Sequence, residues 1–422
     1  MAEMAIITAE RSEAASPAAP RPPADPIARW LVDQAPDLPS TRFVIGEFCR
    51  RLVADGMSLA RSLVSIRTLH PQLEVVGYLW KSGVIEVNEV PRERGILATP
   101  LYLKSPFRLI YEGAPEIRRR VPPLGTEVEF PILADLQELG ATDYICLPLR
   151  FSRGRINVMS FATDRPGGFS DAELDRLRLL LPVLAVVLEV QATNRVAETL
   201  LDTYLGPEAG RRVLSGSIKR GDGTTVAAAL WYCDLSGFTA LTERLPPYDV
   251  IELLDEFFGC MAEPVQSRGG EVLKFIGDAM LAIFPMADDL DRDRACLAAL
   301  DAARQALADF DALNERRRAA GKETLGVKIA LHAGTVIYGN IGAPTRLDFT
   351  VIGPAVNMVT RLEGLAGRLG LRLLASAPFA APCNVELASI GYHPLRGIAL
   401  QQELFTLPDD AQRRGSAEAG DG

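Results

Sequence analysis

The sequence predicts an α+β protein with an N-terminal α/β domain, a helical linker and a C-terminal domain of order β-α-β-β-α-β. An apolar run from Val226 to Cys233 ends on Asp234, and a helix-like pattern opened by Pro247 follows it. Farther along, Gly277-Asp278 joins two short strand-like runs, which is a strong hairpin signal. The length of 422 residues independently predicts two or three domains.

Composition narrows the class of protein. Hydrophobic residues make up 48% and charged residues 23% of the chain, as in ordinary soluble globular proteins. The net charge of −9 argues against a general nucleic-acid-binding protein, which needs a basic face. Six scattered cysteines without a C-x-x-C pair predict reduced thiols rather than a disulfide framework or a zinc site. The most apolar stretch, 177–190, is too short to span a bilayer, so we expect no transmembrane segment and a cytoplasmic location.

The N-terminal part is expected to begin with a disordered tail over residues 1–40, of which 1–25 are rich in Ala and Pro, with Trp30, Leu31 and Val32 as candidates for docking on the rest of the protein. A helical pattern then runs from Thr41 to about Arg67, with a break near Gly56. Next, Leu73–Trp80 and Gly83–Val90 flank a two-residue turn and predict a hairpin.

Further along, the pattern predicts a weak strand at Leu101–Leu103 and a short helix or loop at Pro115–Arg120. Asp143–Leu149 and Arg155–Ala162 predict a strand pair. A capping box at Ser170-Asp171-Ala172-Glu173 opens a long helix.

Three of these runs carry a resemblance: Ile145–Leu149, Asn157–Phe161 and Phe169–Leu174. Because of these three runs, the block 41–191 resembles a GAF-type sensor domain. The resemblance implies either a ligand pocket or a role in dimerisation, and the sequence does not decide between the two. Cys146 lies within an apolar run, which predicts a buried thiol rather than a chromophore attachment point.

The long helix carries leucines that alternate spacings of three and four. This seam of about two heptads is consistent with helix pairing and equally with a core helix of the same domain. Pro182 is expected to kink the helix. A helical linker over 192–223 should lead to the C-terminal domain. The seam consists of Leu174, Leu177, Leu181, Leu184 and Leu188.

The C-terminal domain is expected over 224–408, before a disordered tail over 409–422. A long helix from about Asp291 to Arg318 and a strand at Val327–Ala333 complete the β-α-β-β-α-β order. In that topology the hairpin lies beside the first strand, which brings Asp234 and Asp278 together. Two adjacent carboxylates repel unless a cation bridges them or one is protonated, and a pair of Mg²⁺ ions suits such an open, oxygen-rich site.

Five ordered motifs then make a specific resemblance. The block resembles a class III nucleotidyl cyclase catalytic domain, which has a ferredoxin-like core. The motifs are Cys233–Thr239, Gly270–Asp278, His332–Gly342, Asp348–Leu362 and Pro394–Gly397.

The resemblance implies a metal site. Asp234, Asp278 and the Leu235 carbonyl would hold two Mg²⁺ or Mn²⁺ ions at each site. One ion would activate the ribose 3′-hydroxyl, and the other would hold the triphosphate while pyrophosphate leaves.

The resemblance also implies substrate contacts. Lys274 and Thr350 would read the base and favour ATP, although Thr350 stands where the adenylate type often has Asp. Asn357 would orient the ribose, and Arg361, four residues on, would stabilise charge on the reacting phosphate. Arg396 would contact the terminal phosphates, where the family often has Lys.

In the resembling family the site lies at a head-to-tail dimer interface, with the Asp pair from one protomer and the base and phosphate residues from the other. This chain holds both sets, so a homodimer is expected. The expected function is an adenylate cyclase that makes 3′,5′-cyclic AMP and is regulated by its N-terminal domain through an unknown ligand or partner. The alternatives are a cyclase with relaxed ATP/GTP selectivity and a catalytically silent nucleotide-binding regulator. A silent regulator would normally lack one of Asp234, Asp278, Asn357 or Arg361.

Overall fold

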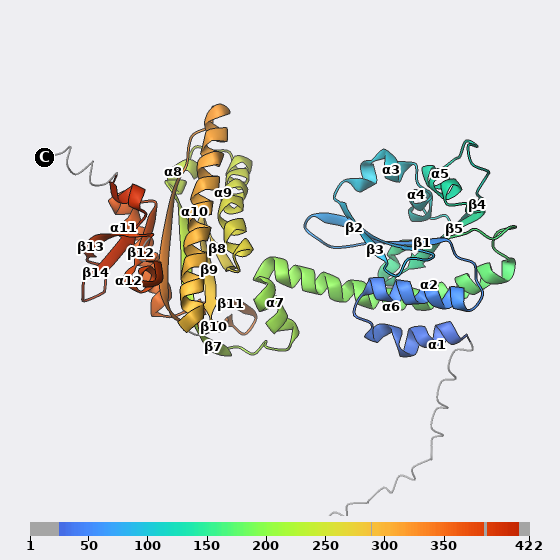
Figure 1. The fold of residues 1–422 in the computed structure, drawn as a ribbon, viewed down its shortest axis with the longest axis horizontal. Coiled ribbons are helices and arrows are strands. Elements are labelled where there is room, and N and C mark those ends of the chain that lie inside the picture. Colours follow the sequence, from blue (N-terminus) through green and yellow to red (C-terminus); the bar gives the residue numbers. More distant parts are fainter. Residues whose placement is uncertain (1–24, 288, 384–385, 413–422) are drawn as a thin grey trace, which may run out of the picture. The chain divides into compact units, whose positions relative to one another are not determined.

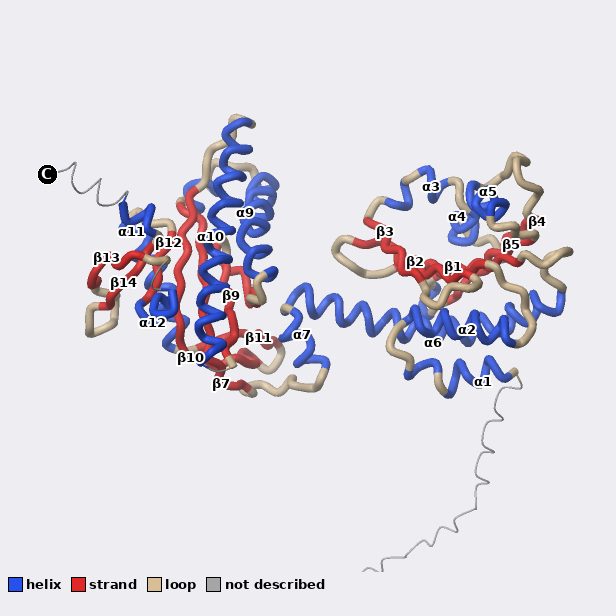
Figure 2. The backbone as a smooth tube through the Cα atoms, viewed as in Figure 1, coloured by secondary structure: helices blue, strands red, loops and turns tan. Residues whose placement is uncertain are grey.

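The computed structural model describes residues 25–287, 289–383 and 386–412, and the chain divides into two compact units. Unit 1 is Met1–Thr199 and unit 2 is Leu200–Gly422. Figure 1 labels their helices and strands, and Figure 2 shows that each unit combines a sheet with helices. The α+β class predicted from the sequence is therefore correct for the described residues.

Unit 1 is built on an antiparallel sheet with the strand order β3-β2-β1-β6-β5-β4. Helices α1, α2 and α6 cover one face of this sheet, and α3, α4 and α5 lie on the other (Figure 1). The strands are β1 Arg61–Arg67, β2 Leu73–Lys81, β3 Asn88–Glu93, β4 Ile117–Arg120, β5 Asp143–Arg150 and β6 Ile156–Thr163. The helices are α1 Pro26–Asp33, α2 Thr41–Ala54, α3 Pro100–Leu103, α4 Pro106–Tyr111, α5 Pro131–Glu138 and α6 Asp171–Leu205.

The predicted β5–β6 pair is confirmed, and Cys146 within β5 is fully buried, as its apolar run predicted. Other predictions for unit 1 differ from the structure. Residues 61–67 form the central strand β1 and not the predicted helix, because the roughly helical spacing of Leu59, Leu63 and Ile66 also fits a largely buried strand. Predicted strand 101–103 is helix α3, which Pro100 opens.

The segment 115–120, predicted as a short charged helix or loop, instead contains strand β4, which pairs with β5. The hairpin of β2 and β3 exists, but β3 begins only at Asn88. Val84 and Ile85 are 52% and 84% exposed, so this segment extends the turn instead of pairing with β2.

The predicted disordered tail was wrong for residues 26–40, and 1–24 lie outside the described residues. Helix α1 begins after Asp25, whose Oδ1 accepts a hydrogen bond from the Ile27 amide nitrogen at 2.8 Å, and Pro26 is at the first helical position. Ile27, Trp30 and Leu31 are buried in the core that α2 and α6 share. Their i, i+3, i+4 spacing is a short amphipathic signal that the neighbouring Ala- and Pro-rich composition obscured.

Replacing Trp30 by Ala should destabilise unit 1 by about 3–5 kcal/mol because it leaves a cavity in this core. Trp30 is 5% exposed, and the Arg51 guanidinium lies 4.7 Å from its ring centroid. Urea unfolding followed by circular dichroism would measure the change. The matched control is Val32→Ala on the same helix, where Val32 is 53% exposed and a change within about 0.5 kcal/mol is expected. Equal effects of the two substitutions would contradict the docking of α1.

Helix α6 begins with the predicted capping box. The Ser170 amide donates to Glu173 Oε2 at 2.8 Å, and the Glu173 amide donates to Ser170 Oγ at 3.4 Å. The helix continues through Pro182 and across the predicted domain boundary at 191. All five seam leucines are buried in the core of unit 1, so this part of α6 is a core helix of that unit.

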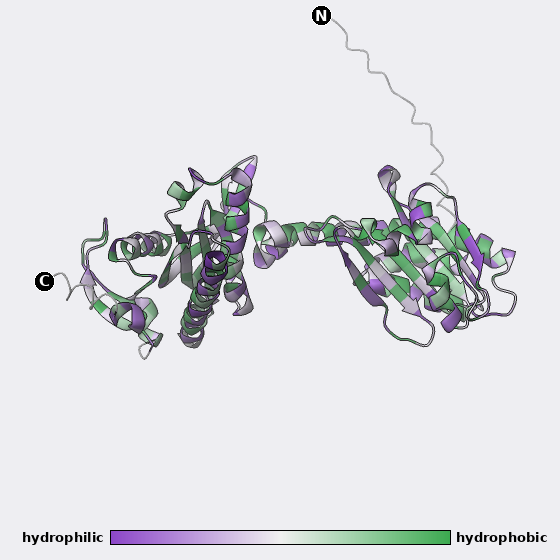
Figure 3. Cartoon of the chain, turned by 90° about the horizontal axis from the view of Figure 1, so that it is seen from above, coloured by the Kyte–Doolittle hydropathy of each residue, from purple (hydrophilic) through white to green (hydrophobic). Residues whose placement is uncertain are grey.

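Hydrophobic residues are frequent along α6 (Figure 3), and by length and composition alone it could cross a membrane. One third of its most apolar window is buried inside the protein. Core helices of soluble domains pass the same test, so α6 is weak support for a membrane span.

Unit 2 contains a sheet with the strand order β13-β14-β12-β10-β7-β9-β8, and β11 pairs with β10. Helices α9 and α10 pack on one face, and α11 packs on the other. The strands are β7 Gly223–Ser236, β8 Glu271–Ile276, β9 Ala279–Met286, β10 Gly326–Ala343, β11 Arg346–Ile352, β12 Leu373–Ser376, β13 Ala388–His393 and β14 Gln402–Thr406. The helices are α7 Pro207–Leu214, α8 Phe238–Thr242, α9 Pro247–Ser267, α10 Asp289–Ala319, α11 Pro354–Leu369 and α12 Ala377–Ala380.

The predicted order of the first strands and helices agrees with the structure. Strand β9 pairs antiparallel with both β7 and β8, so the β8–β9 hairpin lies beside β7. Residues 408–412 are helical, so the predicted disordered tail was wrong for 409–412, and 413–422 lie outside the described residues. The pairing of β9 with β7 directs the β8–β9 turn toward the C-terminal end of β7.

Candidate active site

Two carboxylates meet at the end of β7. Asp234 pairs across the strands with Ala279, so Asp278 in the preceding turn lies next to it. Gly277, with φ of 64°, makes that turn possible. Burial, and then repulsion by the Asp234 carboxylate, raises the pKa of Asp278 to about 6. The structure thus brings together the two acids that the sequence predicted as neighbours.

A lysine missed by the sequence analysis faces this pair. Lys328 lies opposite Asp234 in the β7–β10 register, and its Nζ is 2.7 Å from Asp234 Oδ2 and 2.5 Å from Glu363 Oε1. Burial lowers the pKa of Lys328, but hydrogen bonds to Asp234 and Glu363 outweigh it and raise that pKa. In the sequence, this role is indicated only by the position of Lys328 inside the apolar run that forms β10.

The acid pair fits a divalent cation. Aspartate oxygens are the ligands that Mg²⁺ and Mn²⁺ prefer, and a cation would relieve the repulsion that raises the pKa of Asp278. Within the part of the chain that the structure describes, no three His, Cys, Asp or Glu residues gather into a metal site. Other oxygens would therefore have to complete the coordination shell. The Leu235 carbonyl, next to Asp234, stays a prediction for one of them.

The predicted base-reading residues lie on β8 and β11. Lys274 Nζ donates to Asp348 Oδ2 at 2.5 Å, and Thr350 is two residues farther along the same strand. The Thr350 hydroxyl is buried and has no hydrogen-bond partner among the described residues. An unpaired buried hydroxyl is costly, so it suits a position where a ligand supplies the missing hydrogen bond. Asp348 is the first residue of the motif Asp348–Leu362, and the sequence predicts no role for it.

The predicted ribose and phosphate residues lie on α11 and in the loop after β13. Asn357 and Arg361 are one turn apart on α11. The Arg361 guanidinium lies beside Gly397, where an added Cβ would be 3.5 Å from Nη2, and Arg396 precedes that glycine. The side chains of Asn357, Arg361 and Arg396 form no hydrogen bond or ion pair with any described residue. Two cations near one loop, without carboxylate partners, suit an anionic ligand.

The predicted residues therefore form three groups: the acid pair, the base-reading pair, and the α11 and loop residues. No hydrogen bond or ion pair between described residues joins Asp234 or Asp278 directly to the other two groups. The Lys328–Glu363 ion pair links the acid pair to α11.

Comparison with known proteins assigns part of unit 2. Residues 223–377 match the family described as the adenylate and guanylate cyclase catalytic domain. All of the predicted site residues except Arg396 lie inside this range. The chain thus contains a catalytic domain of the class III adenylate/guanylate cyclase type.

Two relatives carry related names. An adenylate cyclase of Anabaena cylindrica is 37% identical over 161 residues, which cover 37% of this chain and 31% of the relative. Adenylate cyclase 1 of Rhizobium meliloti (strain 1021) is 30% identical over 193 residues, covering 45% of this chain and 28% of the relative. The match thus spans less than a third of the length of either relative.

A solved structure shows a weaker likeness. The crystal structure of the adenylyl cyclase CyaB from P. aeruginosa is 24% identical, with a TM-score of 0.41 over 44% of this chain and 95% of that one.

Proposed function

We propose that the chain is an adenylate cyclase that converts ATP to 3′,5′-cyclic AMP and pyrophosphate. The observation that carries the proposal is the meeting of Asp234 and Asp278, inside the range that matches the cyclase family. The relatives named adenylate cyclase support ATP as the substrate. In the reaction, the ribose 3′-oxygen would bond to the α-phosphorus while the bond to the pyrophosphate oxygen breaks.

Asp234 and Asp278 would hold two Mg²⁺ or Mn²⁺ ions at each site. When bound, such ions supply charge neutralisation and lower the pKa of the attacking hydroxyl. Lys328 would give up part of its contact with Asp234 and keep its ion pair with Glu363. The chain's own acids thus determine where the triphosphate sits.

The remaining residues would bind and orient the nucleotide. Asn357 would donate to the ribose, and Arg361 would stabilise the charge that develops on the reacting phosphate. Arg396 would hold the terminal phosphates. Lys274 would release its contact with Asp348 and donate a hydrogen bond to the adenine ring. The unpaired Thr350 hydroxyl would accept a hydrogen bond from the exocyclic amine.

We further propose a head-to-tail homodimer, in which the acid pair of one protomer faces the Lys274, Asn357 and Arg361 side chains of the other. The absence of partners for Asn357 and Arg361 within the described chain supports this assembly. A cytoplasmic location and a GAF-like sensor role for unit 1 are part of the same proposal. Its antiparallel sheet, covered by helices on both faces, supports the sensor role.

The test is direct. The purified 422-residue chain would be incubated with ATP or GTP in the presence of Mg²⁺ or Mn²⁺, and both cyclic nucleotides would be measured. Cyclic AMP from ATP at a clearly higher kcat/KM than cyclic GMP from GTP is expected. Similar rates with both substrates would favour relaxed selectivity. Nucleotide binding without product under either metal would favour the silent regulator and end the enzyme proposal.

Changing the base-reading residues should change the substrate. In the variant Lys274→Glu plus Thr350→Cys, the acid would accept from guanine where the lysine had donated to adenine. We expect the ratio of kcat/KM for ATP to that for GTP to fall at least about tenfold. The matched control is Lys322→Glu, since Lys322 is half-exposed and lies outside the site. Unchanged selectivity in the double variant would count against Lys274 and Thr350 as base contacts.

A further inference from the structure

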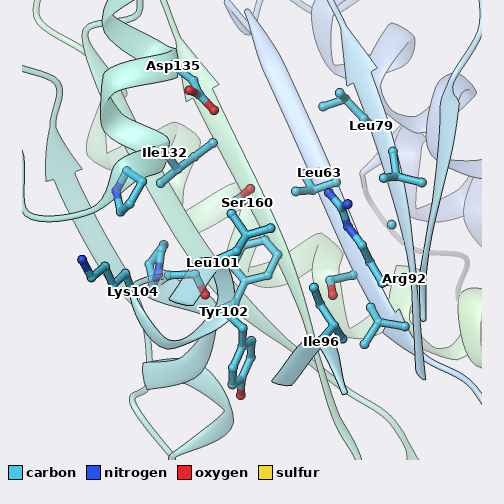
Figure 4. Close-up of a pocket in the computed structure, with 18 of the residues that line it drawn as sticks. Leu63, Leu79, Arg92, Ile96, Leu101, Tyr102, Lys104, Ile132, Asp135 and Ser160 are labelled. Atoms are coloured by element: carbon cyan, nitrogen blue, oxygen red, sulfur yellow. The ribbon is translucent and has the colours of Figure 1, made fainter. Parts of the chain in front are cut away.

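Unit 1 contains a cavity that the proposed reaction does not use. Its volume is about 380 Å³, within the usual range for small-molecule sites. It lies between β1, β2 and β3 on one side and the segments of α3, α4 and α5 on the other. Figure 4 shows lining side chains converging from the sheet and from these helical segments.

The walls are mostly apolar, so burial of hydrocarbon would supply most of the binding free energy. Gly77 lies in the middle of β2 and lines the cavity without a side chain. A glycine inside a strand often marks a place where a ligand approaches the backbone. The apolar lining includes Leu63, Leu79, Val90, Ile96, Phe107 and Ile132.

Two buried hydroxyls in the lining lack partners. Tyr144 is 1% exposed, and although Ser160 lies beside its hydroxyl, no hydrogen bond of normal geometry forms. The Tyr111 hydroxyl is likewise buried and unpaired, with Ser65 nearby. Buried polar groups without partners cost roughly 1–3 kcal/mol each. A ligand with a hydrogen-bonding group would remove part of that cost.

Positive charge exceeds negative charge in the lining. Arg61 is half-buried and interacts electrostatically with Tyr144 and with Asp135, the one acidic residue in the lining. Arg92 and Lys104 are exposed lining residues. The side chains of these three cations form no hydrogen bond or ion pair with any described residue. A half-buried guanidinium without a carboxylate partner favours an anionic ligand.

We propose that this cavity binds a small, mostly apolar molecule that carries one carboxylate. The hydrocarbon would lie between Leu63, Leu79 and Ile132, and the carboxylate would accept from the Arg61 guanidinium and the Tyr144 hydroxyl. The proposal does not depend on the cyclase reaction, because every residue it uses belongs to unit 1.

The test compares three probes of equal chain length: octanoate, octanol and octylamine. Isothermal titration calorimetry on the full chain should show octanoate binding at least about tenfold tighter than octanol, and octylamine binding more weakly than both. Arg61→Met should remove the preference for octanoate and leave octanol binding within about twofold. Arg150→Met is the matched control, since Arg150 lies on β5, outside the cavity lining, and should change nothing.

A cavity-filling variant tests the location. Gly77→Leu should abolish octanoate binding, and its Cβ would make only ordinary contacts, the nearest 3.4 Å from the Val90 oxygen. Circular dichroism would check that the Gly77→Leu variant is folded. If it is not, Leu79→Trp would be used to fill the cavity instead. Failure of all three probes to bind, equal binding of octanoate and octanol, or binding that survives a folded cavity-filling variant would overturn the proposal.

Discussion

Replacing Asp278 by Asn is expected to lower kcat/KM for cyclic AMP formation at least about 100-fold. The substitution keeps the size of the side chain but removes one of the two carboxylates that would hold the cations, an interaction that contributes several kcal/mol. Initial rates over a range of ATP concentrations at saturating Mn²⁺ would measure the loss. The matched control is Asp255→Asn on α9, because Asp255 is exposed and distant in sequence from the acid pair. A loss of less than about threefold in Asp278→Asn would contradict the metal role.

The same variant should lose activity without losing stability. The pKa of Asp278 is raised from its ordinary 3.8 to about 6, so the folded protein binds this proton more tightly than the unfolded chain does. The stability contribution of that proton is therefore lost as the pH rises from about 4 to about 6. At neutral pH an uncharged Asn removes the repulsion with Asp234, and the melting temperature of the metal-free protein should be equal or higher. A clearly lower melting temperature would indicate that Asp278 is structural.

Mixing two inactive variants should restore activity. Arg361→Ala alone should cost about 10²–10³ in kcat, as the loss of a charge-stabilising donor does. In a head-to-tail dimer of Arg361→Ala with Asp278→Asn, one site carries both substitutions and the other carries neither. If the two variants are coexpressed equally, half of the dimers are mixed, and activity should return to about a quarter of the wild-type value.

The control for that experiment is coexpression of Asp234→Asn with Asp278→Asn. Both substitutions lie in the acid pair, so every site in every dimer carries at least one substitution. No activity should return. Restoration in this control, or no restoration in the Arg361→Ala mixture, would rule out a shared site.

The elements predicted correctly are those with local signals. The capping box at Ser170 opens α6 because its hydrogen bonds lie within four residues. Pro247 opens α9, and Gly277-Asp278 makes the β8–β9 turn, because both depend on backbone preferences of single residues.

The elements predicted wrongly are those that tertiary packing decides. Strand β1 lies in the middle of the unit 1 sheet, and its apolar residues fit a helical spacing as well as a buried strand. Helix α1 is only eight residues long and is stable because Trp30 and Leu31 pack against other helices. The leucine seam of α6 was compatible with either helix pairing or a core, and only the surrounding sheet decided for the core.

The sequence by itself determined the order of strands and helices in unit 2, and through that order the meeting of Asp234 with Asp278. Only the tertiary structure revealed that Lys328 bridges Asp234 to Glu363, that the Thr350 hydroxyl has no partner, and that a cavity lies under β1 and β2. The reason is physical: topology follows from local turns and apolar runs, whereas cross-strand register, side-chain pairing and empty volume depend on residues distant in the chain that pack together only in the folded protein.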